Sequence, residues 1–301
     1  MANLKWSSND IAPQDHRVVV ITGATSGLGK EAARILAGKH ATVIMAVRNT
    51  PKGEQVATEF KREFPGAVIE VRKLDLGSLS SVKAFSEELH AAYPRLDILI
   101  NNAGVMACPY SKTEDGFEIQ MGTNHLGHFA LTGGLMPLLR KTQGSRIVVT
   151  SSIAHRMGNI DFEDIHWEKR KYQTAKAYGD SKLANLYFAY ELARKLKDDP
   201  DAPRVTAAHP GWTSTELQRH SLLFRVLNPL FAQAVDSGVL PTLRAAMDAN
   251  AKSGDYFGPS GFQELKGPPI LVKSNAMSYN TANAQRLWNL SEKMTGIQFL
   301  S

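Results

Sequence analysis

The chain has 301 residues, of which 43% are hydrophobic and 21% are charged. This size and composition predict one globular domain over residues 1–301 and exclude a disordered chain. The formal net charge is +6, but the basic residues are scattered and short clusters such as 169–171 have no aromatic residues among them. A nucleic-acid partner is therefore not expected.

Cysteine content and hydropathy restrict the compartment. The single cysteine, Cys108, excludes an intramolecular disulfide and a cysteine-cluster metal site, and no metal is expected. It favours a reducing, cytoplasmic environment. Residues 1–15 are polar and lack the apolar core of a signal peptide. No stretch approaches about 18 uninterrupted apolar residues, so no transmembrane segment is expected.

Six short runs rich in β-branched residues alternate with amphipathic segments long enough to form helices. The runs lie at residues 17–22, 41–47, 68–74, 96–101, 146–150 and 204–209. Their alternation predicts an α/β fold, a doubly wound, Rossmann-like parallel sheet with helices on both faces. Ligands of such sheets bind beyond the carboxyl ends of the strands, so the residues after each run are the candidate site residues.

The first run leads into a glycine-rich turn and then into a helical segment at residues 30–37. A sharp turn without β-carbons lets backbone N–H groups approach a pyrophosphate, and the helix N-terminus adds positive potential. The glycine spacing is GxxxGxG, not GxGxxG, and its place after a first strand favours nucleotide binding over an ordinary turn. The residues expected to contact the dinucleotide are Gly23, Thr25, Ser26, Gly27, Leu28 and Gly29.

Residues after the next three runs suit the same ligand. Arg48 lies where an NAD site usually carries a carboxylate, and an arginine there accommodates the 2′-phosphate of NADP(H); a solvated arginine is the alternative. Asp75 and Leu76 follow the third run, where a carboxylate can meet an adenine edge. The small residues after the fourth run are Asn102, Ala103 and Gly104. They let a cofactor pass over them, although asparagine side chains equally serve the local backbone.

Tyr178 and Lys182 lie four positions apart in a helical stretch that runs to about residue 196, so they share one helix face. A nearby ammonium lowers the pKa of a phenol, which would make Tyr178 an acid/base group; a surface pair is the alternative. The fifth run ends in Thr150, Ser151 and Ser152, and a hydroxyl there would hold a substrate oxygen against the tyrosine. A Ser-His-Asp hydrolase is disfavoured because no GxSxG elbow is present.

Taken together, the motifs resemble the short-chain dehydrogenase/reductase superfamily. They are TGATSGLG at 22–29, LDL at 74–76, NNAG at 101–104, TSS at 150–152, YGDSK at 178–182 and HPG at 209–211. The resemblance covers residues 17 to about 214. It implies a single Rossmann-like domain with about seven strands, and hydride transfer between NAD(P) and a carbonyl or alcohol.

The resemblance also assigns roles, motif by motif. Tyr178 would be the acid/base, and Lys182 would lower its pKa and bind the nicotinamide ribose. Ser152 would hold the substrate oxygen, with Ser151 as the alternative register. Asn124 would support a water in a proton relay. The residues that would border the nicotinamide are Pro210, Gly211 and Thr213.

Segments at 46–54, 116–129 and 151–165 resemble a narrower branch, which contains retinol dehydrogenases, WW-domain oxidoreductases and light-dependent protochlorophyllide reductases. The 26-position step from Ser152 to Tyr178 is wider than usual in the superfamily and implies an insertion beside the active site. This branch implies an NADP-dependent oxidoreductase acting on a bulky apolar aldehyde, ketone or alcohol. The alternatives are a protochlorophyllide reductase-like double-bond reductase, disfavoured by the single cysteine, and a non-catalytic NADP(H)-binding sensor or scaffold.

The apolar segment at residues 221–231 lies in the region expected to set substrate choice. We expect a lid at about residues 212–233, because hydride transfer requires a cleft that excludes water. Core packing and a membrane-docking helix are the alternatives, so peripheral membrane contact is a second partner hypothesis beside the small-molecule substrate. The helix near Tyr178 pairs subunits in relatives, which makes a homodimer or homotetramer the candidate assembly.

Overall fold

A parallel sheet forms the centre of the computed structural model, which describes residues 5–212 and 234–300. Within these residues the strand order is β3-β2-β1-β4-β5-β6-β7-β8. The strands are β1 Val18–Thr22, β2 Thr42–Val47, β3 Ile69–Lys73, β4 Ile98–Asn101, β5 Arg146–Thr150, β6 Arg204–Ala208, β7 Tyr256–Pro259 and β8 Pro269–Leu271. β1 to β7 run parallel and β8 is antiparallel to β7. The predicted doubly wound fold of about seven strands is confirmed, with β8 as an additional edge strand.

The six predicted runs correspond to β1 to β6. Every residue of β1 and β5 is buried, as expected for strands covered by helices on both faces. The sequence did not reveal β7 and β8, which are short and contain Gly258, Pro259 and Pro269. Glycine and proline weaken the pattern by which a strand is recognised.

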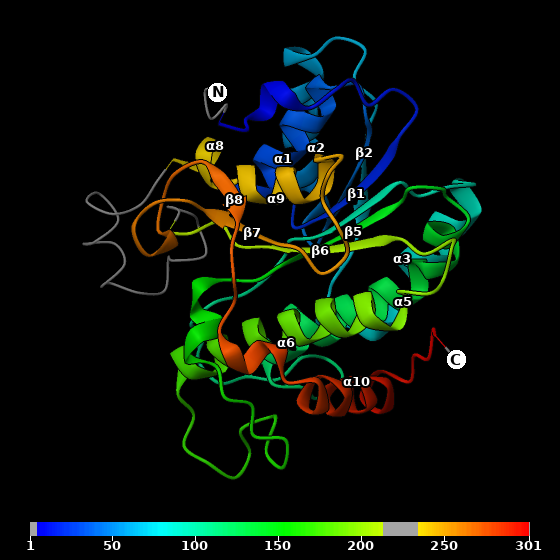
Figure 1. The fold of residues 1–301 in the computed structure, drawn as a ribbon. Helices are drawn as coiled ribbons and strands as arrows, with labels where there is room; N and C mark the ends of the chain where they lie inside the picture. The colour runs from blue at the N-terminus through cyan, green and yellow to red at the C-terminus, as the bar shows by residue number, and fades with distance from the viewer. Residues whose placement is uncertain (1–4, 213–233, 301) are drawn as a thin grey trace.

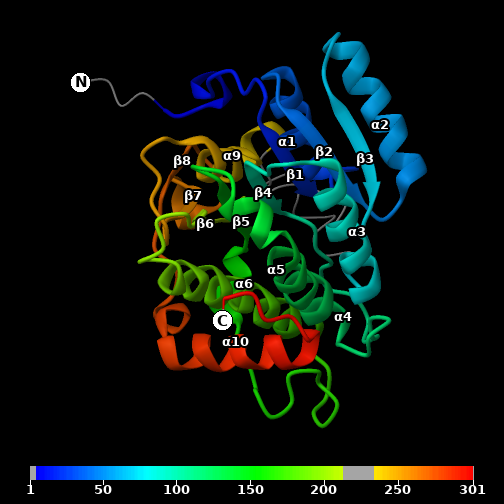
Figure 2. The ribbon, with the colours of Figure 1, turned by 90° about the vertical axis from the view of Figure 1, so that its right-hand side faces the viewer.

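Helices cover both faces of the sheet (Figures 1 and 2). One face carries α1 Gly27–Gly38, α2 Thr50–Glu63, α8 Val235–Gly238 and α9 Leu240–Met247. The other carries α3 Leu79–Ala92, α5 Gly127–Arg140 and α6 Thr174–Lys195. The short helix α4 Ile119–Met121 continues through a π-helical turn, Gly122–Leu126, into α5. Each face of the sheet is thus buried in its own apolar core.

The last helix, α10 Thr281–Thr295, lies on the outer side of α6 in both views (Figures 1 and 2). Trp288 on α10 contacts Phe129 of α5 edge-on and stacks on Phe188 of α6. Phe299, beyond α10, adds ring contacts to Phe129 and Trp288. The C-terminal segment therefore packs against α5 and α6 and covers their outer side.

The expected lid at 212–233 falls almost entirely outside the described residues. Trp212 is described, and its backbone N–H donates to the Leu265 carbonyl at 2.8 Å. The apolar segment 221–231 and Thr213 lie outside the described residues.

Candidate active site

The glycine turn has the shape that a phosphate cradle requires. Gly23 and Gly27 adopt left-handed φ values of 70° and 53°. A Cβ on Gly29 would lie 2.4 Å from the Gly23 carbonyl oxygen and 2.5 Å from Asn102 Nδ2. Ser26, the N-cap of α1, makes no side-chain capping bond, whereas Asn49 caps α2 in this way. The Ser26 side chain thus does not occupy the first N–H groups of α1, and the shape of the turn fits a dinucleotide pyrophosphate.

The loop after β4 is tied to β1 next to this turn. The backbone N–H groups of Asn102 and Ala103 both donate to Thr22 Oγ1 at 2.9 Å, and Asn102 Nδ2 donates to the Thr22 carbonyl at 2.8 Å. A Cβ on Gly104 would lie 3.0 Å from Asn124 Oδ1 and 3.6 Å from Lys182 Nζ. Asn102 therefore has the structural role expected of an asparagine here, because its side chain bonds the backbone of β1. The loop connects the glycine turn with the catalytic candidates.

The residues expected at the adenosine end have separate environments. The Arg48 side chain is exposed beyond β2, and its carbonyl accepts a 2.7 Å bond from Lys73 Nζ. Asp75 is partly buried, and its Oδ1 accepts the Gly77 N–H at 2.9 Å. Leu76 is buried against α5, where a Cβ on Gly127 would lie 2.3 Å from the Leu76 carbonyl oxygen. Contact of these side chains with a nucleotide stays a prediction.

Tyr178, Lys182 and Ser152 converge beyond the end of β5. The Ser152 hydroxyl lies close enough to the Tyr178 phenol to act on its pKa. Lys182 is buried; its Nζ donates to the Thr150 carbonyl at 3.2 Å and lies 5.7 Å from the centroid of the Tyr178 ring. Ser151 instead donates to the Lys182 carbonyl at 2.9 Å from a buried position. The geometry therefore favours Ser152 over Ser151 as the hydroxyl that faces the tyrosine.

Burial shifts both titratable groups toward their neutral forms. It raises the pKa of Tyr178 to about 12, against the opposing effect of Ser152. It also lowers the pKa of the Lys182 ammonium to about 8. In each case the charged form loses its hydration. Desolvation thus dominates at Tyr178 within the protein itself, and the expected lowering of its pKa by Lys182 stays a prediction.

Asn124 lies in the π-helical turn, beside these residues. Its Nδ2 donates to the Val105 carbonyl at 3.0 Å and to Ser181 Oγ at 2.9 Å, while its Oδ1 accepts the Val105 N–H at 2.8 Å. The carboxamide thus joins the loop after β4 to α6 on the turn next to Lys182. Its expected role in a water relay is a prediction that these contacts do not test.

The expected insertion before Tyr178 packs beside the start of α6. Arg170 lies over the Trp167 ring, 3.7 Å from its centroid, and pairs with Asp180 at 3.7 Å. Asp180 also accepts the Asn159 N–H at 2.7 Å, and burial raises the pKa of its carboxyl to about 6. The insertion thus anchors the turn of α6 that carries the catalytic candidates.

Sequence reasoning missed a polar chain beside Gly211, which has a left-handed φ of 67°. The Gly211 N–H donates to Nδ1 of the buried His209 at 3.2 Å, and His209 Nε2 lies 2.8 Å from Glu264. Arg156 donates to the same carboxylate at 2.7 Å. Pro210 next to it is partly exposed. The HPG motif contained the histidine, but nothing in the sequence pointed to Glu264, 55 positions away.

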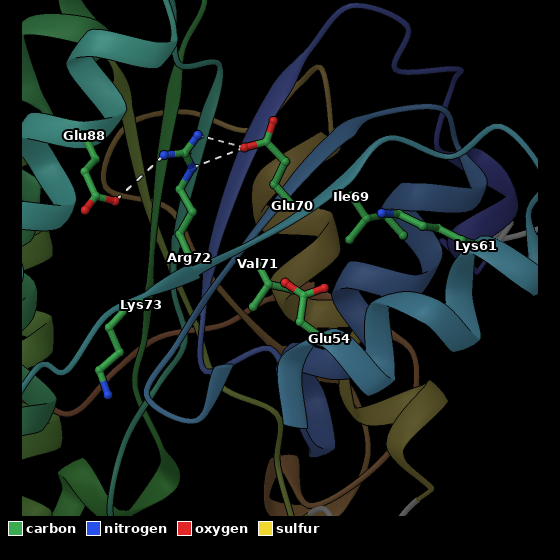
Figure 3. A pocket seen from close by; sticks show the side chains of 8 residues that line it. All are labelled: Glu54, Lys61, Ile69, Glu70, Val71, Arg72, Lys73 and Glu88. Atoms are coloured by element: carbon green, nitrogen blue, oxygen red, sulfur yellow. Dashed lines mark hydrogen bonds and ion pairs between the residues drawn. The ribbon is translucent and has the colours of Figure 1, made fainter. Parts of the chain in front are cut away.

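A surface hollow of about 450 Å³ lies elsewhere (Figure 3). It is lined by residues of α2, β3 and α3, and among its charges Arg72 bonds Glu70 at 2.8 Å and approaches Glu88 at 3.8 Å. None of the candidate catalytic residues lines it. It is therefore not the site defined by the strand ends.

Residues 5–212 and 234–300 contain no group of three or more His, Cys, Asp or Glu side chains that could hold a metal ion. Among them no helix combines the length and the apolar character needed to cross a membrane.

Known proteins resemble this chain over nearly its whole length. Residues 17–223 match the family described as short chain dehydrogenase. The chain is 45% identical to retinol dehydrogenase 12 of Mus musculus over 289 residues, which cover 94% of this chain and 87% of that protein. Retinol dehydrogenase 11 of Homo sapiens is 41% identical over 286 residues, with 93% and 86% covered.

Solved structures extend the comparison. An uncharacterised protein from Mycobacterium paratuberculosis is similar with a TM-score of 0.83 and 42% identity, over 98% of this chain and 99% of that one. A short chain dehydrogenase from Shigella flexneri complexed with NADP has a TM-score of 0.66 and 28% identity, over 82% and 98%. The chain belongs to the short-chain dehydrogenase family. Within that family it belongs to the retinol dehydrogenase branch.

Proposed function

We propose that this protein transfers a hydride between NADP(H) and a carbonyl or alcohol group. The observation that carries the proposal is the convergence of Ser152, Tyr178 and Lys182 beside the loop after β4, which packs against the glycine turn. The nicotinamide would supply or accept the hydride, and the residues of the protein would hold the substrate oxygen and move its proton.

The proton chemistry follows from Tyr178. With a pKa of about 12 its phenol is protonated at neutral pH, so it is ready to donate a proton to a carbonyl oxygen. Ser152 would position that oxygen by a hydrogen bond, and the buried Lys182 would place a positive charge near the developing anion. The protonated phenol is the form of Tyr178 that carbonyl reduction requires.

A preference for NADP(H) over NAD(H) is the second part of the proposal. Arg48 is exposed at the end of β2, with no acidic residue next to it in the sequence, and can pair with a 2′-phosphate. A solved relative from Shigella flexneri is complexed with NADP. Both observations support NADP(H).

The proposed substrate is a bulky apolar aldehyde, ketone or alcohol. Support comes from retinol dehydrogenases 11 and 12, which are 41% and 45% identical to this chain. A panel of carbonyls from short aldehydes to retinaldehyde, followed by NADPH absorbance, would define the class. We also propose a cytoplasmic location, supported by the single cysteine.

Replacement of Tyr178 by phenylalanine tests the proposal. Loss of the phenol should reduce turnover by at least about a hundredfold, because proton transfer is removed, while NADPH affinity stays unchanged. The matched control is Tyr187→Phe on the same buried helix, whose hydroxyl accepts only a 3.4 Å bond from Asn283. Wild-type turnover by Tyr178→Phe would overturn the catalytic assignment. If the wild type bound NADPH tightly but reduced no carbonyl of the panel, the alternative of a non-catalytic NADP(H)-binding sensor would be supported instead.

A further inference from the structure

His128 is a buried histidine of α5 whose two ring nitrogens both have partners. Its Nδ1 lies 3.0 Å from the carbonyl oxygen of Asn124, and its Nε2 lies 2.9 Å from Thr22 Oγ1. Its exposed fraction is 2%, and both partners are completely buried. Neither the glycine turn nor the catalytic triad of side chains includes this residue.

The chemistry of the partners fixes the tautomer. A carbonyl oxygen only accepts, so Nδ1 must carry the hydrogen and donate to Asn124. In a neutral ring Nε2 is then an acceptor, and the Thr22 hydroxyl must donate to it. Burial lowers the pKa of His128 to about 4, so the ring is neutral at physiological pH. Thr22 Oγ1 also lies 3.4 Å from the Ile100 carbonyl, a longer and weaker alternative.

These bonds extend in both directions. On one side, Thr22 Oγ1 accepts the N–H groups of Asn102 and Ala103, which lie against the glycine turn. On the other side, Asn124 Nδ2 donates to Ser181 Oγ, which donates to the Tyr178 carbonyl at 2.8 Å. These hydrogen bonds therefore link the loop beside the glycine turn to the helix of the catalytic tyrosine. The link passes through Asn124, which contributes its backbone carbonyl to His128 and its carboxamide to Ser181.

We propose that His128 is a positioning residue, which couples the dinucleotide turn through Thr22 to the catalytic helix through Asn124. The inference rests on the proposed function, because it assigns the two ends of the series to cofactor binding and to catalysis. Its two arms are chemically distinct: Nε2 accepts from the cofactor side and Nδ1 donates to the catalytic side.

Two amide substitutions separate the arms. In His128→Asn, the Nδ2 group occupies the place of Nδ1 and can still donate to Asn124, but the acceptor for Thr22 is lost. In His128→Gln, the longer side chain can place its Oε1 near Thr22, but the donor to Asn124 is lost. A buried hydrogen bond contributes about 1 kcal/mol net, so each loss should appear as roughly a fivefold effect.

The two variants should therefore show opposite patterns. His128→Asn should raise the Kd for NADPH, measured by fluorescence, roughly fivefold and leave kcat within about twofold of the wild type. His128→Gln should leave the Kd within about twofold and lower kcat roughly fivefold. Thr22→Ser, which keeps the hydroxyl, should retain wild-type affinity, whereas Thr22→Val should weaken NADPH binding.

Thr132→Val is the control for a purely structural effect. It removes a buried hydroxyl of α5 that accepts a 3.0 Å bond from Asn101, outside the series. It should lower the unfolding midpoint without separating Kd from kcat. If both His128 variants changed Kd and kcat in parallel with their unfolding midpoints, the coupling role would be wrong and His128 would serve only the core.

Failure of the proposed function is recognisable separately. A wild type that does not bind NADPH would overturn the proposed function and this inference together. If the wild type binds NADPH but reduces no carbonyl, only the catalytic proposal fails. The NADPH binding measurements then still test the coupling role of His128. In that case, unchanged NADPH affinity in both His128→Asn and Thr22→Val would overturn the coupling.

Discussion

At the scale of single residues, Lys182 combines a functional charge with a cost in stability. Its ordinary pKa is 10.5, and burial lowers it to about 8. The difference corresponds to about 3 kcal/mol of disfavoured charge. In the unfolded chain Lys182 holds its proton more tightly, because its pKa there is higher. The loss of folding stability from the buried charge is therefore complete below pH 8. It declines as the pH rises and disappears above pH 10.5.

Replacement of Lys182 by methionine should therefore stabilise the protein at neutral pH while abolishing turnover. The expected gain is about 1–3 kcal/mol at pH 7, because a similar apolar volume replaces a buried charge, and it should shrink toward zero near pH 10. Urea unfolding at the two pH values measures it. Lys176→Met, at an exposed position of the same helix, should change stability little at either pH. A destabilisation of Lys182→Met equal at both pH values would contradict the penalty.

At the scale of elements, the sequence predicted best those segments whose signal is local. β1 to β6, the glycine turn and the α6 pair of Tyr178 and Lys182 each have a pattern within a few neighbouring residues. β7 and β8 were missed because glycine and proline occupy these short strands. The partners of His128 and His209 were missed because their hydrogen bonds join residues 106 and 55 positions apart. Such contacts exist only once the sheet has brought the loops together.

The packing of α1 against the loop after β4 makes Gly29 the most restrictive glycine of the turn. In Gly29→Ala the new methyl group would meet the Gly23 carbonyl at 2.4 Å, so the turn must move. We expect the Kd for NADPH to rise at least about tenfold, together with a loss of roughly 1–3 kcal/mol in stability.

The control for that substitution is Gly38→Ala at the other end of α1. Its Cβ would approach only the Phe64 ring, at 2.9 Å, which a side-chain movement can relieve. It should cost stability without changing NADPH affinity. Fluorescence titration of both variants decides the point: equal affinities would mean that Gly29 does not shape the cradle.

At the scale of the whole molecule, the parallel topology explains why the site is composite. Parallel strands bring their carboxyl ends to one edge, so Thr22, Arg48 and Ser152 lie along that edge although they come from different parts of the chain. The local motifs in the sequence therefore locate this edge, because the fold that they predict brings the strand ends together. The sequence could not supply the shape of the substrate cleft, because local motifs do not specify which side chains line it once the chain is folded.

A ligand that bridges several strand ends should stabilise the whole fold. At a concentration one hundred times its Kd, NADPH should add about 2.7 kcal/mol, because it binds the native but not the unfolded chain. The melting temperature should then rise by several degrees, and more with NADPH than with equimolar NADH, since only NADPH offers a phosphate to Arg48.

In Arg48→Asp the carboxylate repels that phosphate and accepts a hydrogen bond from a free ribose 2′-hydroxyl, so NADH should stabilise the variant more than NADPH does. Thermal shifts with both nucleotides, on wild type and variant, measure this. An unchanged preference in Arg48→Asp would show that another residue selects the cofactor.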